Sequence, residues 1–181
     1  MKKINFLIIV LLTTTAVCGQ EHLTLQENGI FQWQKVYEAN NTNDLKSDLL
    51  TSVVLNNIIV LDDNSFKGEV LVAPNWRQAM IDVGKKPMNT PIAIRSYDIK
   101  GTALVEIKGS RYRVTVQDLK LVYKEVGNSY EKKGNETSFE DYILKANGTI
   151  RPFYTKEPNW LELYDETLSN LFVLKESGDE W

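Results

Sequence analysis

The fold of this chain is decided by one segment, GTALVEIKGSRYRVTVQ, at residues 101–117. Apolar and polar residues alternate on both sides of a turn at 108–110, which is the pattern of two antiparallel strands with one buried face. The buried face is expected to carry Ala103, Val105, Ile107, Tyr112, Val114 and Val116. The outward face would carry Arg111, Arg113, Thr115 and Gln117. The segment therefore predicts a hairpin with one face packed on the domain and the other in solvent.

Further strands are expected on both sides of this hairpin. A strand at 92–97 would reach it through a turn at 98–101, and a bulge would extend the last strand over 119–123. Upstream, alternation predicts a strand at 29–38. A second hairpin is predicted from strands at 58–61 and 66–72, around the turn-forming residues 62–65.

Two helices are predicted, one near each end of the domain. Leu45, Leu49 and Val53 recur at helical spacing after capping residues at 42–44, so we expect a helix that ends near 56–57. At the other end, Asn159 followed by Glu162 marks the start of a C-terminal helix with an apolar face.

The remaining segments are expected to be loops and one late hairpin. Residues 74–91 lose their periodicity and predict a long irregular loop with one helical turn at most. Residues 126–138 are polar and predict a mobile loop. Asn147 and Gly148 are a hairpin signal between strands at 139–144 and 149–154, although Pro152 weakens the second strand.

The order of these elements and the KGSRYR sequence at 108–113 resemble a family of exported bacterial domains of unknown function, family 4468, with a fold like that of the TATA-binding protein. The segments FQWQKVY at 31–37 and FKGEV at 66–70 support the resemblance, which covers roughly residues 29–125. Residues 139–181 lie largely outside it and would complete the domain with the hairpin and the helix.

The resemblance implies a TBP-like α+β fold, in which an antiparallel sheet of about six strands carries helices on one face. The expected order is β-α-β-β-β-β-β and then the C-terminal helix. The family has no established function or catalytic residues, so the resemblance implies no activity, and a fold name alone does not imply DNA binding.

The first nineteen residues have the parts of a secretory signal peptide. Lys2 and Lys3 precede an apolar run at 6–12, and small residues at 16–19 offer a cleavage site. We expect cleavage after Gly19, a periplasmic or secreted product, a flexible mature N-terminus at 20–28 and no membrane-spanning segment in the mature chain. The alternative is a lipid anchor on Cys18, but Val17 stands where a lipoprotein signal has a small residue.

Composition excludes several classes of function. Cleavage removes two of the 21 Lys and Arg residues and none of the 24 Asp and Glu residues, so the net charge falls from −3 to −5. An acidic exported domain lacks the basic surface that nucleic acid requires. The mature chain would keep one histidine, His22, and no cysteine, which argues against Ser–His or Cys–His catalysis and against a zinc site. We therefore predict no cofactor and no metal.

The candidate binding residues fall into two groups. The long loop would present Trp76, Met80 and Met88 for recognition, although Trp76 could equally tuck back onto the sheet. Arg111 and Arg113, with Arg95 beside them, could hold a carboxylate or a phosphate. The alternative for the arginines is a polar sheet face that Glu106 and Glu69 balance, and we favour it.

Acidic residues leave one enzymatic alternative open. Two carboxylates at suitable separation suffice for glycoside hydrolysis, and the adjacent pairs are Asp62-Asp63, Glu140-Asp141 and Asp165-Glu166. Adjacent side chains diverge on helices and strands, so we interpret the first pair as turn residues and the others as solvated faces. The spacing around Asp62 and Asn64 does not match a calcium-binding loop.

The sequence therefore favours an exported, non-catalytic α+β domain that binds an unknown protein or envelope component. A carboxylate-dependent hydrolase of an envelope glycan is the alternative, and two convergent acids in one pocket would indicate it. A third hypothesis is an apolar ligand held between the sheet and the helices, beside Trp33 and Tyr37.

Overall fold

The structure is a computed structural model that describes residues 22–39, 45–53, 55–124 and 132–174. The signal peptide predicted at 1–19, with Cys18, and the capping residues predicted at 42–44 lie outside the described residues. The strands are β1 (Leu23–Leu25), β2 (Phe31–Glu38), β3 (Asn56–Asp62), β4 (Ser65–Val72), β5 (Tyr97–Lys108), β6 (Arg111–Tyr123) and β7 (Glu136–Ser138). The helices are α1 (Leu45–Ser52), α2 (Trp76–Asp82), α3 (Ile92–Arg95), α4 (Phe139–Ile143) and α5 (Trp160–Leu171), with 3-10 turns η1 (Pro87–Asn89) and η2 (Pro152–Tyr154).

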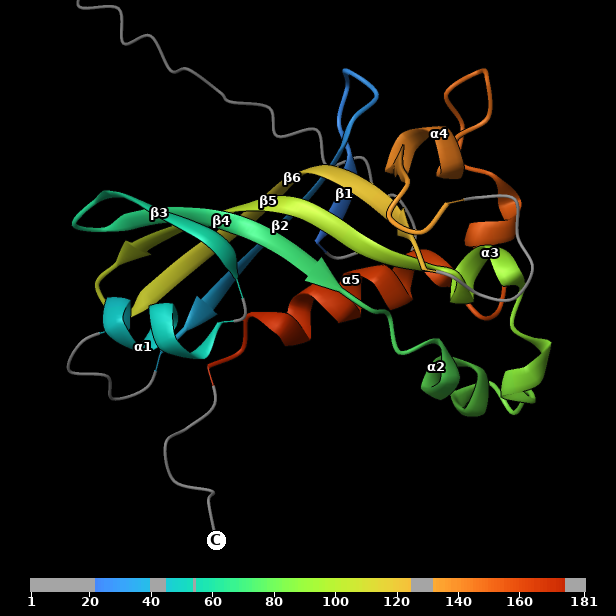
Figure 1. The fold of residues 1–181 in the computed structure, drawn as a ribbon, viewed down its shortest axis with the longest axis horizontal. Helices are drawn as coiled ribbons and strands as arrows, with labels where there is room; N and C mark the ends of the chain where they lie inside the picture. Colours follow the sequence, from blue (N-terminus) through green and yellow to red (C-terminus); the bar gives the residue numbers. More distant parts are fainter. Residues whose placement is uncertain (1–21, 40–44, 54, 125–131, 175–181) are drawn as a thin grey trace, which may run out of the picture.

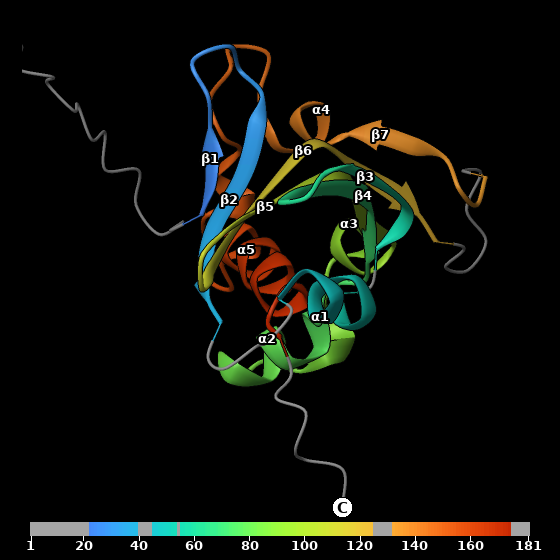
Figure 2. The ribbon, with the colours of Figure 1, turned by 90° about the vertical axis from the view of Figure 1, so that its left-hand side faces the viewer.

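The strands form one antiparallel sheet in the order β1-β2-β6-β5-β4-β3, with β7 paired to β6. The sheet is curved, and α5 runs along its concave side (Figures 1 and 2). The predicted fold class, an antiparallel sheet with helices in an α+β arrangement, is confirmed.

The hairpin of β5 and β6 buries most of the face predicted to be buried, but Thr115, which was predicted to face solvent, is only 8% exposed, and Ile107 is only partly buried. Val105 pairs with Val114 and Ala103 with Val116, and all four side chains are buried. The predicted extension through a bulge is also confirmed, because the register shifts after Lys100 and β6 continues to Tyr123. The middle of the sheet therefore follows directly from the alternation in the sequence.

The two predicted helices are also present, although the first ends at Ser52 and not near 56–57, where β3 has already begun. In α1, Leu45 and Leu49 are buried, as is Val53 just beyond its end at Ser52. In α5, the Asn159 side chain accepts a hydrogen bond from the backbone N–H of Glu162 at 3.3 Å, which is the predicted N-terminal cap.

Polar and aromatic contacts fix α5 against the sheet. Trp33 Nε1 donates to Asp165 Oδ1 at 2.6 Å, and Tyr37 OH donates to the Ser169 carbonyl at 2.8 Å. The rings of Trp33 and Phe172 stack with centroids 5.7 Å apart. The space predicted for an apolar ligand beside Trp33 and Tyr37 is thus filled by the protein's own side chains.

The predicted strand at 92–97 is wrong. Residues Ile92–Arg95 form α3 after Pro91, and the predicted turn at 98–101 is the first part of β5. Proline suits the start of a helix, since it has no N–H to satisfy there. Tyr97 and Ile99 are buried and continue the alternation of β5, so the alternation already begins before the predicted turn.

Four loop or hairpin predictions also need correction. The irregular loop at 74–91 contains α2 and η1, and the mobile loop at 126–138 ends in β7. The late hairpin keeps its turn at Asn147-Gly148 and one bridge, Leu144 to Ile150, but α4 and η2 replace its strands. In the N-terminal segment, predicted to be flexible, Leu23–Leu25 pairs with β2 as β1.

Two glycines of the hairpin segment test this packing. A Cβ at Gly101 would lie 2.7 Å from Val116 Cγ1 and 3.1 Å from the Gln117 carbonyl oxygen, whereas Gly109 has a φ of +63° and open space around it. Gly101→Ala is therefore expected to lower the free energy of unfolding by about 2–3 kcal/mol through overpacking. Gly109→Ala is expected to cost only about 1 kcal/mol, from its left-handed backbone. Urea unfolding measures both, and equal costs would contradict the close approach at Gly101.

Candidate functional site

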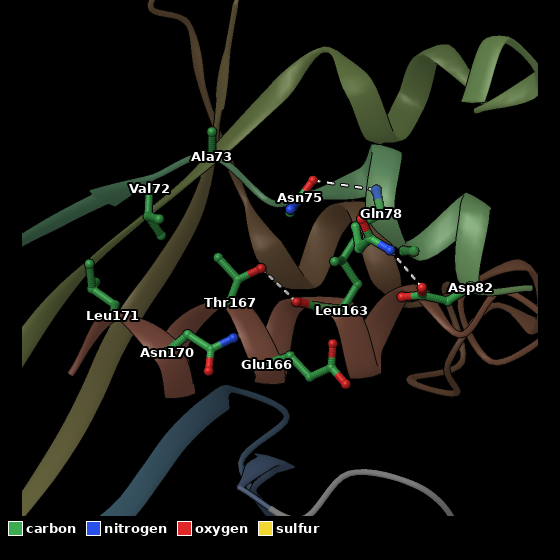
Figure 3. A pocket seen from close by; sticks show the side chains of 11 residues that line it. Val72, Ala73, Asn75, Gln78, Asp82, Leu163, Glu166, Thr167, Asn170 and Leu171 are labelled. Carbon is green, nitrogen blue, oxygen red and sulfur yellow. Dashed lines mark hydrogen bonds between the residues drawn. The ribbon is translucent and has the colours of Figure 1, made fainter. Parts of the chain in front are cut away.

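A groove lies between α2 and α5 where β4 ends (Figure 3). Its volume is about 390 Å³, which is within the range of small-ligand sites. It exists because the chain leaves the sheet after Val72, turns at Asn75 and forms α2 opposite the outer side of α5. The Asn75 side chain caps α2 by accepting a hydrogen bond from the Gln78 backbone N–H at 3.4 Å.

The groove has an apolar floor and a polar rim. The floor is made of buried or partly buried side chains, namely Val72, Ala79, Leu163 and Leu171. The rim is made of exposed polar side chains, namely Asn75, Gln78, Asp82, Glu166 and Asn170. This combination suits a ligand that offers an apolar body to the floor and hydrogen-bonding groups to the rim.

Local hydrogen bonds orient part of the rim. Gln78 Nε2 donates to Asp82 Oδ1 at 2.7 Å, one helical turn along α2. Across the groove, Thr167 Oγ1 donates to the Leu163 carbonyl at 2.6 Å (Figure 3). The hydroxyl of Thr167 is therefore engaged by its own helix, and the exposed amide and carboxylate groups are the ones available to a ligand.

The groove is acidic. Asp82 from α2 and Glu166 from α5 are its carboxylates, and no Lys, Arg or His is among the described residues that line it. Burial raises the pKa of Glu166 above its ordinary value, and the neighbouring charges of Glu162, Asp82 and Asp165 raise it further. Negative charge at Glu166 is therefore opposed by its surroundings, and a cation in the groove would relieve that repulsion.

The structure separates the predicted loop residues Trp76, Met80 and Met88. Met80 is only 2% exposed and belongs to the hydrophobic core, whereas Met88 on η1 is 88% exposed. Trp76, the first residue of α2, is partly buried against the core, and the Arg77 guanidinium lies 5.0 Å from its ring centre. None of the three lines the groove. The packing of Trp76 agrees with the tucked-back alternative, and a binding role for it stays a prediction.

The structure does not bring the three predicted arginines together. Arg111 and Arg113 begin β6, but Arg95 precedes β5 at the other end of the hairpin, roughly 35 Å away along a strand of this length. Arg113 donates to Glu106 Oε2 from Nε at 3.0 Å and from Nη2 at 2.7 Å. Glu69 instead accepts a hydrogen bond from Asn57. For Arg113, the structure therefore agrees with the favoured alternative, in which Glu106 balances the arginine on a polar face of the sheet.

One member of each adjacent acid pair has a structural role. Asp62 accepts a hydrogen bond from the Asn64 backbone N–H at 2.8 Å, which is the expected turn contact and the main cause that lowers its pKa. Glu140 was expected on a solvated face, but its carboxylate accepts from the Phe31 backbone N–H at 2.7 Å. Asp165 was also expected there and is buried, at 7% exposed, bound to Trp33.

The groove residues were missed because α2 was expected to be irregular. Gln78 and Asp82 are four residues apart, a spacing that places them on one helix face, and this is the signal that could have found them. Among the described residues, no three His, Cys, Asp or Glu side chains gather as metal ligands. None of the helices formed by those residues is both long and apolar enough to cross a membrane.

Two solved structures are similar to this chain. One is a TBP-like protein from Parabacteroides distasonis, with a TM-score of 0.42 and 18% sequence identity over 81% of this chain and 90% of that chain. The other is a DUF4468 family protein from Bacteroides ovatus, with a TM-score of 0.40 and 9% identity over 84% of this chain and 91% of that chain. Both descriptions match the resemblance given by residues 29–125. No protein-family model matches the chain, and no curated protein matches it significantly.

Trp76 provides a test of how its helix is held. Trp76→Ala is expected to remain folded and to lose about 1–2 kcal/mol of unfolding free energy, because only part of the ring is buried. Met80→Ala, which empties a core position on the same helix, is expected to cost about 2–4 kcal/mol. Urea unfolding followed by circular dichroism compares the two variants. A loss at Trp76 as large as that at Met80 would show that the ring is a core residue with no face left for a ligand.

Proposed function

We propose that this chain is an exported, non-catalytic binding module whose α2–α5 groove takes a short basic segment of an envelope protein. The observation that carries the proposal is the groove's construction, with an apolar floor and a rim whose charged side chains, among the described residues that line it, are Asp82 and Glu166. A basic peptide segment would place aliphatic stems on the floor and its ammonium or guanidinium groups on the rim.

Export is supported by the sequence of the first nineteen residues and is part of the same proposal. A signal peptide followed by an acidic mature domain suits a partner outside the cytoplasm that carries positive charge. The mature charge of −5 given by the sequence would attract such a partner at long range.

A glycan hydrolase is the second candidate, because Asp82 and Glu166 lie on facing helices and line one groove. A general acid needs a raised pKa, and the pKa of Glu166 is raised by partial desolvation and by the neighbouring acids Glu162, Asp82 and Asp165. Against this candidate, both carboxylates are exposed to solvent, whereas acid catalysis of glycosidic cleavage relies on a desolvated carboxyl group. The binding function is therefore favoured.

The test places a photoreactive benzophenone amino acid at Gln78 on the groove rim, in the full chain expressed in its own host. Illumination is expected to give a discrete crosslinked protein with a basic segment at the crosslink, recovered outside the cytoplasm with this chain beginning at Gln20. Asp82→Asn combined with Glu166→Gln should reduce the yield at least tenfold, because the rim loses both charges. The matched control carries the same amino acid at Glu27, in the turn between β1 and β2.

Two other outcomes would contradict the proposal. Equal crosslinking from Gln78 and Glu27 would show that the groove is not the binding site. Release of reducing ends from purified envelope glycan, abolished by Asp82→Asn and by Glu166→Gln singly, would establish the hydrolase instead.

A further inference from the structure

The dipeptide Asn-Gly occurs twice in the chain, each time in an exposed turn. Asn28-Gly29 joins β1 to β2, and Asn147-Gly148 forms the turn after α4. Asparagine is a thermolabile residue, and a following glycine has no side chain to keep its backbone nitrogen away from the asparagine amide. Both turns therefore hold the parts of an intramolecular reaction, which are an amide carbon and a nitrogen next to it.

The two turns are built alike. In each, the glycine N–H donates to the carbonyl three residues earlier at 2.9 Å, which belongs to Gln26 in the first turn and to Lys145 in the second. Each glycine has a left-handed backbone, with a φ of +78° at Gly29 and +76° at Gly148. Because these features are common to both turns, none of them makes one asparagine more reactive than the other.

A single hydroxyl distinguishes the two turns. Asn147 Oδ1 accepts a hydrogen bond from the Thr149 backbone N–H at 3.2 Å and another from Thr149 Oγ1 at 2.7 Å. Asn28 Oδ1 accepts one from the Ile30 backbone N–H at 3.1 Å, and isoleucine has no hydroxyl to add a second. In the turn after α4, the residue two places after the asparagine thus supplies two donors to the amide oxygen.

The second donor matters for the chemistry of the amide. When the Gly148 nitrogen attacks Asn147 Cγ, negative charge develops on Oδ1. Donors that already point at an oxygen stabilise the charge that forms on it in the transition state. The hydroxyl of Thr149 is such a donor, so it is expected to lower the barrier to attack at Asn147.

We propose that Asn147 is a self-modification site, which the Thr149 hydroxyl makes more reactive than Asn28. The Gly148 nitrogen forms a bond to Asn147 Cγ, the bond from Cγ to Nδ2 breaks, and Nδ2 leaves as ammonia with the proton of the glycine nitrogen. Water then opens the cyclic imide. Opening at Cγ gives aspartate, and opening at the backbone carbonyl gives isoaspartate. Either product adds one negative charge to the turn, and no residue of the α2–α5 groove takes part.

The test incubates the secreted protein, purified from a bacterial host that expresses the full chain, in mildly alkaline buffer. Peptide mapping by mass spectrometry follows both turns, and digestion at acidic pH stops the reaction before the measurement. Asn28 is the internal standard, because both asparagines are measured in the same sample. Asn147 is expected to convert to aspartate and isoaspartate about five times faster than Asn28, a smaller effect than a desolvated oxyanion donor gives, because the turn is exposed.

Reciprocal substitutions test the role of the hydroxyl. Thr149→Val keeps the shape of the side chain and is expected to slow Asn147 to the rate of Asn28, whereas Thr149→Ser is expected to keep Asn147 fast. Ile30→Thr introduces a hydroxyl into the other turn and is expected to raise the rate at Asn28. Circular dichroism melting verifies that each variant is folded. In urea-unfolded wild type, the two asparagines are expected to react at similar rates.

Three outcomes would overturn the proposal. Equal rates at Asn147 and Asn28 in the folded wild type would show that the hydroxyl has no effect. A wild-type rate at Asn147 in the folded Thr149→Val variant would show the same. A rate difference that persists unchanged in urea would show that the neighbouring sequence, and not the folded turn, sets the reactivity.

Discussion

The hydrogen bond between Trp33 and Asp165 is the interaction on which the rest of the structure depends. A carboxylate in a protein interior is costly unless donors surround it, and Asp165 receives one from Trp33 Nε1 at 2.6 Å and one from the His22 backbone N–H at 3.3 Å. Trp33 lies on β2, and His22 directly precedes β1, so both donors belong to the first two strands or the residue before them. A rotation of α5 would leave the carboxylate buried and unpaired, so this contact fixes which side of the helix faces the sheet.

The site follows from that orientation. With Asp165 turned toward the sheet, the next residues on the outer side, Glu166 and Asn170, face α2. The Tyr112 hydroxyl also donates to the Phe172 carbonyl at 2.6 Å, which anchors the end of α5. The groove between α2 and α5 is therefore bounded on one side by a helix that the core holds rigidly, and this is the arrangement from which a binding surface gains precision. Its acidic rim and apolar floor are the basis for the proposed basic partner.

Residues whose environment follows from local periodicity could be predicted from the sequence. Ala103, Val105, Val114 and Val116 alternate regularly, and the structure buries each of them. The Asn159 cap of α5 is equally local, since the helix start needs a side-chain acceptor there. The central sheet and the helices α1 and α5 could therefore be predicted without any knowledge of the tertiary structure.

Elements that depend on tertiary contacts could not be predicted in this way. Residues 139–144 were expected to form a strand because they precede the hairpin signal at Asn147-Gly148, yet they form α4, where Phe139 packs edge-on against Phe31 at 5.2 Å and against Tyr164 at 5.3 Å. Asp165 was expected in solvent because its partner, Trp33, is 132 residues away in the chain. The groove was missed partly because α2 was expected to be irregular, and partly because its two walls come from segments that the sequence gives no cause to place together.

A double-mutant cycle on Trp33 and Asp165 tests this account most directly. Trp33→Phe, Asp165→Ala and the double variant would be compared with the wild type by urea unfolding. We expect a coupling energy of about 2 kcal/mol, because each single change leaves one buried polar group without its partner. Additive losses, with a coupling energy below about 0.5 kcal/mol, would contradict the claim that this contact sets the position of α5.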